Sequence, residues 1–195
     1  MTANTTPALN TTAAAVVFSD ETLTAAAALA DDAYSPLWIG PSGEQSTGEA
    51  VARHLDATAV LLDQDGWTRT TTYNTPTSTD LPADDTGMTV KDMVRALLRL
   101  IRDEIDAPVS RHSLSTALNR VGGGDQGDPD TAWIAGSVLD VIVRAHTGSD
   151  SARAFPWSER LVRTHEDIVA LLTAGATFAH TYGPSAADSV GATAA

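Results

Sequence analysis

Five histidines are the residues of this sequence best suited to metal chemistry, because imidazole is the commonest protein ligand for transition metals. Their spacing does not favour a shared ion. His165 and His180 would lie about 22 Å apart on one helix that rises 1.5 Å per residue. His54 and Asp56 are two residues apart, so on a helix they point to different faces. The sequence therefore predicts neither a metal site nor a cofactor.

The segment from Gly122 to Asp130 combines three consecutive glycines with several aspartates, a composition shared with calcium and phosphate loops. An EF-hand loop also needs a glutamate at its twelfth position, and a phosphate loop needs a lysine after its glycines. This segment has neither feature. We interpret it as a flexible acidic connector between two helices.

Serine and threonine are abundant, but none lies in the Gly-x-Ser-x-Gly pattern of a nucleophile elbow. No histidine and aspartate are spaced as the base and orienting group of a catalytic triad. A triad assembled only by folding would leave no such spacing. The sequence leaves an enzymatic activity open and favours a protein that is not an enzyme.

Lys91, Arg95 and Arg99 recur every four residues, which places them along one edge of a helix. The chain around them is acidic, with 12 Lys and Arg against 25 Asp and Glu and a formal net charge of -13. The basic edge has two interpretations. It pairs with acidic residues of the same chain, such as Asp103 or those in residues 20–49, or its arginines hold an anionic ligand or an acidic partner protein.

Aromatic and arginine residues form a second group of candidates, because these types are enriched at the energetic centres of protein interfaces. The alternative is that the two tryptophans of this group cap the ends of the hydrophobic core. With the two arginines of the basic edge, the candidate binding residues are Trp67, Arg69, Tyr73, Arg95, Arg99, Trp157 and Arg160.

Composition excludes several classes of function. The negative charge repels nucleic acid and anionic membrane surfaces, so we expect no direct binding to either. The absence of cysteine excludes disulfides, thiolate zinc sites and cysteine nucleophiles. Residues 1–18 lack the basic start of a secretory signal, and no apolar run reaches the roughly 18 to 20 residues that span a bilayer. These features predict a cytoplasmic protein.

The elements that must position these residues are mainly helices, predicted from apolar residues at helical spacing and from capping residues. The pattern indicates helices between Ser19 and Tyr34, from Ser46 to Gly66, Thr89 to Pro108, Ser113 to Val121, Thr131 to Ala145, and Thr164 to Gly183. The helix after Thr89 has the clearest apolar face, and the one after Thr131 carries the fewest charges and should be the most enclosed. Thr, Tyr and Trp between Trp67 and Asn74 suit a short strand.

The expected fold class is therefore all-α, with about five helices in a small bundle and room for one short β-hairpin after Trp67. A chain of 195 residues supplies one ordinary domain, which we place at residues 19–183. Residues 1–18 and 184–195 hold few large apolar side chains. They cannot offset the entropy of ordering, so we expect disordered tails.

Two motifs link the sequence to a known group of proteins. The first is the step Gly66-Trp67-Thr68 at the end of a helix, and the second is Trp157 followed by the helix start Thr164-His165-Glu166-Asp167. In these features the stretch from Ala50 to Tyr182 resembles a family of uncharacterised proteins from actinobacteria and their bacteriophages. The resemblance implies a helical fold and that origin, and it implies no activity.

Three hypotheses for function follow. The first is a non-enzymatic protein-binding or accessory protein of an actinobacterium or actinophage. The second is a small-molecule-binding domain or small enzyme with a pocket near Trp157 and His165. The third is an acidic mimic of nucleic acid that occupies a DNA-binding protein.

Overall fold

The computed structural model describes residues 16–70, 89–95, 98, 111–125 and 127–185. Within these ranges the regular secondary structure is helical, which confirms the all-α class. The bounded helices are α1 (Asp20–Asp31), α2 (Gly48–Asp65), α4 (Leu114–Gly122), α5 (Pro129–Thr147), α6 (Ala154–Ser158) and α7 (His165–Tyr182).

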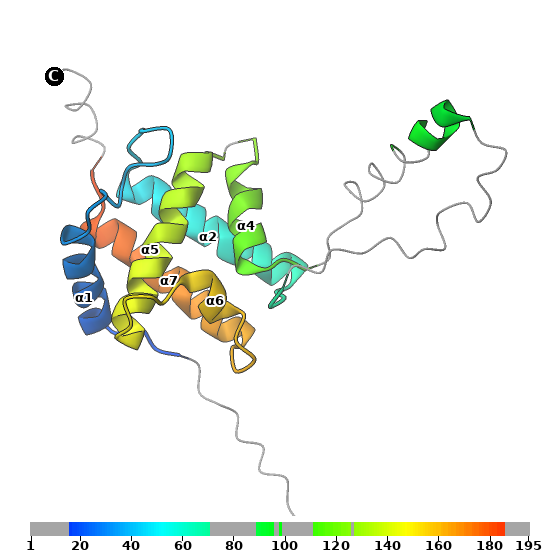
Figure 1. Ribbon diagram of the computed structural model, residues 1–195. Helices are drawn as coiled ribbons and strands as arrows, with labels where there is room; N and C mark the ends of the chain where they lie inside the picture. The colour runs from blue at the N-terminus through cyan, green and yellow to red at the C-terminus, as the bar shows by residue number, and fades with distance from the viewer. Residues whose placement is uncertain (1–15, 71–88, 96–97, 99–110, 126, 186–195) are drawn as a thin grey trace, which may run out of the picture.

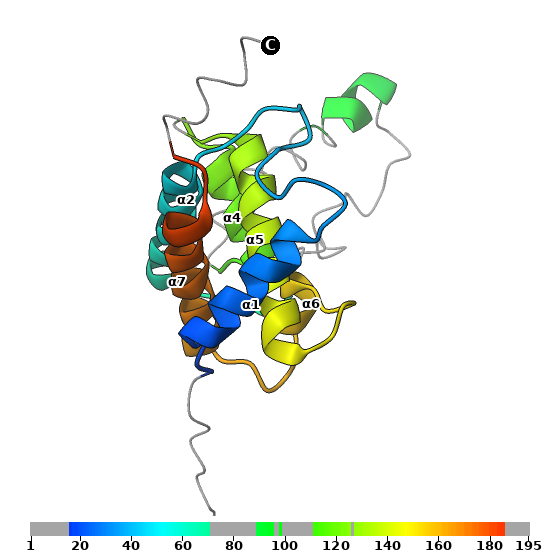
Figure 2. The ribbon, with the colours of Figure 1, turned by 90° about the vertical axis from the view of Figure 1, so that its left-hand side faces the viewer.

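The helix α5 is the centre of the bundle and lies between α1 and α4 (Figure 1). The helices α2 and α7 lie side by side along their lengths and form the most extensive helix pair (Figure 2). The short helix α6 covers one end of α5. Ten residues of α5 are buried, so the prediction that this helix is the most enclosed is confirmed.

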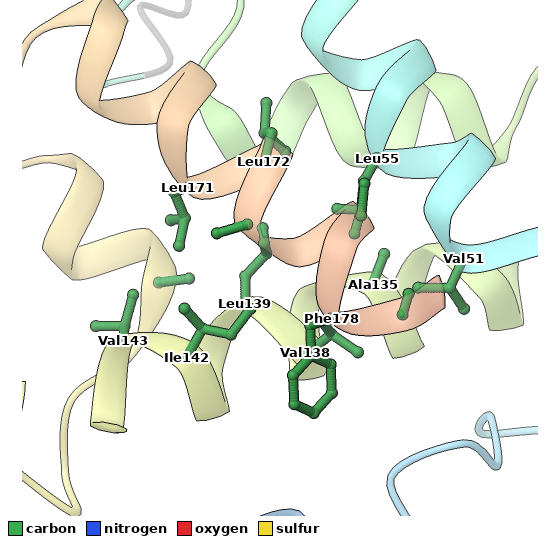
Figure 3. Close-up of a cluster of buried hydrophobic side chains, with 14 of the residues drawn as sticks. Val51, Leu55, Ala135, Val138, Leu139, Ile142, Val143, Leu171, Leu172 and Phe178 are labelled. Atoms are coloured by element: carbon green, nitrogen blue, oxygen red, sulfur yellow. The ribbon is translucent and has the colours of Figure 1, made fainter. Parts of the chain in front are cut away.

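The hydrophobic core lies where α2, α5 and α7 meet (Figure 3). Leu55 of α2 and Leu139 of α5 are fully buried and converge on Gly175 of α7. A Cβ atom on Gly175 would lie 2.7 Å from Leu139 Cδ2 and 2.9 Å from Leu55 Cδ1. The missing side chain therefore lets three helices approach one another closely.

Two helix starts differ from the prediction. Thr47, rather than Ser46, caps α2 by accepting a hydrogen bond from Ala50 N–H, and Ser46 is buried. The helix α5 begins at Pro129, two residues before the predicted start, with Asp128 as its cap. Proline suits the first helical position because its missing N–H would have no partner there.

The packed domain extends beyond the predicted boundaries at both ends. Val16 N–H donates to Asp167 Oδ1 at 2.7 Å, and the Phe18 ring lies 5.9 Å from the Trp157 ring. At the other end, Gly48 N–H donates to the Pro184 carbonyl at 2.9 Å. These contacts attach residues that the sequence assigns to the tails. The rest of both predicted tails, 1–15 and 186–195, lies outside the described residues.

The predicted β-hairpin after Trp67 is not present in the part of the chain that the structure describes. Trp67 forms only an isolated parallel bridge with His112, and residues 71–74 are outside the described ranges. Residues 90–95 and 98 are helical, in agreement with the helix predicted after Thr89, whose remainder also lies outside those ranges.

Candidate functional site

The predicted binding residue Trp157 is inside the protein. Its side chain is 1% exposed, and the Arg163 guanidinium lies 4.0 Å from its ring centre, a cation–π contact. Phe18 packs against the same ring. The alternative interpretation, that this tryptophan belongs to the core, is the one that agrees with the structure.

Trp67 and Arg69 are occupied by contacts within the chain. The Arg69 guanidinium lies 5.3 Å from the Trp67 ring centre, and its Nη2 donates to the carbonyls of Leu161 at 3.2 Å and Arg163 at 2.8 Å. Arg69 therefore attaches the connection between α6 and α7 to the end of α2. Arg160 lies exposed in that same connection.

The basic edge is described only in part. Arg95 Nη1 lies 3.6 Å from Asp92 Oδ1, one turn earlier in the helix, and both side chains are about half exposed. This is pairing within the helix, as one of the two interpretations predicts, although with Asp92 as the partner. Arg99 and Tyr73 lie outside the described residues.

The helix at residues 90–95 and 98 differs most from expectation, because the sequence predicts that its apolar face packs inward. Val90, Met93, Val94 and Leu98 are instead 78%, 40%, 50% and 60% exposed. The bundle core is complete without them, since α5 is already enclosed by α1, α2, α4 and α7. The helix thus presents apolar side chains that the described protein does not cover.

The two ends of the segment that carries this helix, residues 69–111, lie next to each other. Thr68 N–H donates to the His112 carbonyl at 2.9 Å, and His112 N–H donates to the Gly66 carbonyl at 3.0 Å. The His112 side chain is buried, and its Nε2 lies 3.0 Å from Asp65 Oδ2. We call these contacts between residues 65–68 and His112 the closure. No motif in the sequence marks His112 as the partner of Asp65.

A cleft of about 620 Å³ opens beside the first turns of α2, which is a volume typical of small-molecule sites, usually ~300 to 1,000 Å³. Its polar lining comes from α2, from the segment before it and from the start of α5. The lining includes Gln45, Ser46, Thr47, Arg53, His54, Asp128 and Thr131. The cleft is not near Trp157 and His165, because His165 lies 3.3 Å from Asp63 at the opposite end of α2.

His54 forms one wall of this cleft and is almost completely buried. Burial lowers its pKa, while the hydrogen bond to Leu118 and the Asp128 charge act in the opposite direction. His54 Nε2 lies 3.1 Å from the Leu118 carbonyl. Because a carbonyl can only accept, Nε2 must carry the proton, and in the neutral ring Nδ1 is then a hydrogen-bond acceptor.

Asp128 also lines the cleft, and its carboxylate ends a chain of hydrogen bonds. Asp128 Oδ2 accepts from Thr131 N–H at 2.8 Å and from the Thr131 hydroxyl. That hydroxyl lies 2.8 Å from Ser46 Oγ, so Ser46 donates to Thr131. The hydrogen bonds from Thr131, foremost among the causes, lower the pKa of Asp128 and keep it ionised.

The glycine-rich connector also lines the cleft, through Gly124 and Gly127. Gly124 N–H donates to the Val121 carbonyl and Gly127 N–H to the Gly124 carbonyl, so these donors cannot hold a phosphate. A Cβ on Gly127 would lie 2.6 Å from the Gly122 carbonyl carbon. This part of the connector is packed against the end of α4 because it lacks side chains.

Comparison with known proteins places the sequence in a group. Residues 46–178 match DUF6197, a family of unknown function. The chain belongs to this family. The DUF6197 match includes the closure, α2, α5 and nearly all the polar lining of the cleft, and it covers most of the stretch in which the resemblance was found. No curated protein and no solved structure matches the chain.

Among the described residues, histidine and acidic side chains do not gather in groups of three or more that would suit a metal ion. The same part of the chain has no helix whose length and hydropathy would let it cross a membrane.

Proposed function

We propose that this DUF6197 protein is a non-enzymatic accessory protein that binds another protein through the helix at residues 90–95 and 98. The observation that carries the proposal is the exposure of Val90, Met93, Val94 and Leu98 on this helix. Apolar side chains that a protein leaves in water gain free energy when a partner covers them. An amphipathic helix is a common element for such contacts, because its apolar face fits into a groove of the partner.

The charges beside this face indicate the chemistry of the partner. Lys91 and Arg95 belong to the same helix, and the pair between Arg95 and Asp92 is largely exposed. An exposed pair of this kind stabilises a protein by about 0 to 1 kcal/mol, so it can exchange for a pair with a partner at little cost. We infer a partner whose groove has an apolar floor and an acidic rim.

The position of the helix in the chain also supports this role. The closure holds the two ends of residues 69–111 beside Asp65, so a contact made by the helix need not disturb the bundle. The origin that we propose is an actinobacterium or one of its bacteriophages. Eleven arginines beside the single lysine, Lys91, fit the GC-rich coding of that group.

Affinity capture with the full chain tests the proposal. The variant Val94→Glu places a charge on the apolar face, and Val60→Glu is the matched control because Val60 is 52% exposed on α2. We expect the wild type and the control to retain the same partner and Val94→Glu to lose it. All three proteins should have the same melting temperature, because neither valine belongs to the core.

Two results would contradict the proposal. If Val94→Glu alone lowered the melting temperature by several degrees, the apolar face would be packing against this chain's own bundle. If Val94→Glu and the wild type retained the same proteins with equal affinity, the helix would not be the binding element.

A further inference from the structure

The cleft beside α2 contains an arginine that has no carboxylate partner. Arg53 lines the cleft and is exposed, and it forms no ion pair with any acidic residue that the structure describes. Arg144, Arg153 and Arg163, by contrast, each lie within 4.0 Å of an aspartate. A free guanidinium offers a planar set of donors that fits a carboxylate or a phosphate.

The cleft also contains two acceptors. His54 Nδ1 is an acceptor that receives no hydrogen bond from the described residues, and the His54 side chain lines the cleft. The Asp128 carboxylate is exposed in the same cleft. Asp130 N–H donates to Asp128 Oδ1, and the Thr131 N–H and hydroxyl donate to Oδ2, which fixes the orientation of this carboxylate.

We propose that this cleft binds a small zwitterion, a molecule that carries both a protonated amine and an anionic group, such as an amino acid or a short peptide. The amine donates to Asp128 and to His54 Nδ1. The anionic group accepts from Arg53. This ligand site is separate from the helix at residues 90–95 and 98 and does not depend on the proposed protein contact.

The combination of charges argues against simpler ligands. A plain anion would meet Arg53 but would be repelled by the Asp128 carboxylate. A plain amine would contact Asp128, but it would leave Arg53 without a counter-ion. The Arg53 guanidinium would then contribute nothing to the binding free energy. A ligand with both charges satisfies both groups, and the cleft volume of about 620 Å³ accommodates an amino acid or a short peptide.

The experiment measures binding to the full chain by thermal shift and by calorimetry at millimolar concentrations. The probes are the proteinogenic L-amino acids and glycine-containing dipeptides, tested one at a time. Each probe that binds is compared with its N-acetyl derivative, which lacks the ammonium group, and with its carboxamide, which lacks the carboxylate. We expect at least one probe to bind and both of its derivatives to bind about tenfold more weakly or not at all, since a hydrogen bond to a charged group contributes about 1.5 to 3 kcal/mol.

Two substitutions separate the ends of the ligand. Arg53→Gln should weaken the zwitterion about tenfold and leave the affinity of its carboxamide unchanged. Asp128→Asn should weaken the zwitterion and leave the N-acetyl derivative unaffected, while asparagine still caps α5. Arg160→Gln, which removes an exposed arginine outside the cleft, should change nothing. The proposal is overturned if no probe binds, if the derivatives bind as well as the parent compound, or if Arg53→Gln and Asp128→Asn leave the affinity unchanged.

Discussion

Gly48 and Gly183 lie backbone to backbone where the first turn of α2 meets the end of α7. A Cβ on Gly48 would lie 2.8 Å from Gly183 Cα and would also clash with the Ala179 carbonyl. Both obstacles are main-chain atoms, so a rotamer change cannot relieve the clash. This contact sets how closely the largest helix pair of the bundle packs.

Gly48→Ala should therefore destabilise the protein by about 3 kcal/mol, near the upper end of the range for overpacking. Chemical denaturation followed by circular dichroism measures the change. Gly123→Ala is the matched control, because the nearest atom to its Cβ would be 3.4 Å away and its φ is negative. Equal stability of the two variants would contradict the role of the Gly48 contact.

Arg69→Ala should loosen the connection between α6 and α7. Its Nη2 bonds to the Leu161 and Arg163 carbonyls would be lost, and we expect a destabilisation of about 1 kcal/mol because these bonds are partly exposed. Hydrogen–deuterium exchange at residues 159–164 should become faster. The control variant Arg160→Ala removes an exposed arginine from the same connection. Amide exchange at residues 159–164 in this variant should match that of the wild type.

Stability should fall as the pH is lowered from about 7 to about 5, in part because of two histidines. Burial lowers the pKa of His54 and, with a further contribution from Arg163, that of His146. In the unfolded chain both titrate near 6.5, so below that pH the unfolded state takes up protons that the folded state does not. His146→Gln should reduce the fall in melting temperature over this range. A slope identical to the wild type would show that His146 does not contribute.

Asp167→Ala should remove two hydrogen bonds and the ion pair in which Arg163 Nη1 lies 4.0 Å from Asp167 Oδ2. Asp167 Oδ2 accepts from Thr164 N–H in the capping box of α7, and Oδ1 holds Val16 N–H. Thr164 still caps α7 through its hydroxyl, so the lost bond from Thr164 N–H costs about 0.5 to 1.5 kcal/mol, and the unpaired Val16 donor adds to this. Exchange of the amides from Val16 to Leu23 should also accelerate. Asp167→Asn keeps an acceptor and should show the smaller change in both measurements.

The sequence predicts the bundle well because the helices that form it carry local signals. The stripe of apolar residues in α7 and its capping residues Thr164 and Asp167 lie within a few residues of one another. The same reasoning is less successful for the helix after Thr89. Its apolar face is as regular as that of α7, but periodicity shows only that a face exists and not what covers it.

The candidate site depends on distance in the folded chain, which sequence spacing does not record. Arg53 and His54 belong to α2, whereas Asp128 precedes α5, and α4 lies between them in the sequence. In the sequence, His54 and Asp56 point to different faces of a helix, and Asp128 belongs to an acidic connector. Only the packing of α2 against α4 and α5 places these side chains around one cleft.

The closure between Trp67 and His112 has a consequence for how this family can vary. Because the two ends of residues 69–111 are held together, the bundle sets no fixed length for the chain between them. Doubling the length of a flexible loop costs only about 0.6 kcal/mol in closure entropy. We therefore expect insertions and deletions among homologues to accumulate at this point, while Gly66 and His112 stay aligned on either side of the gap.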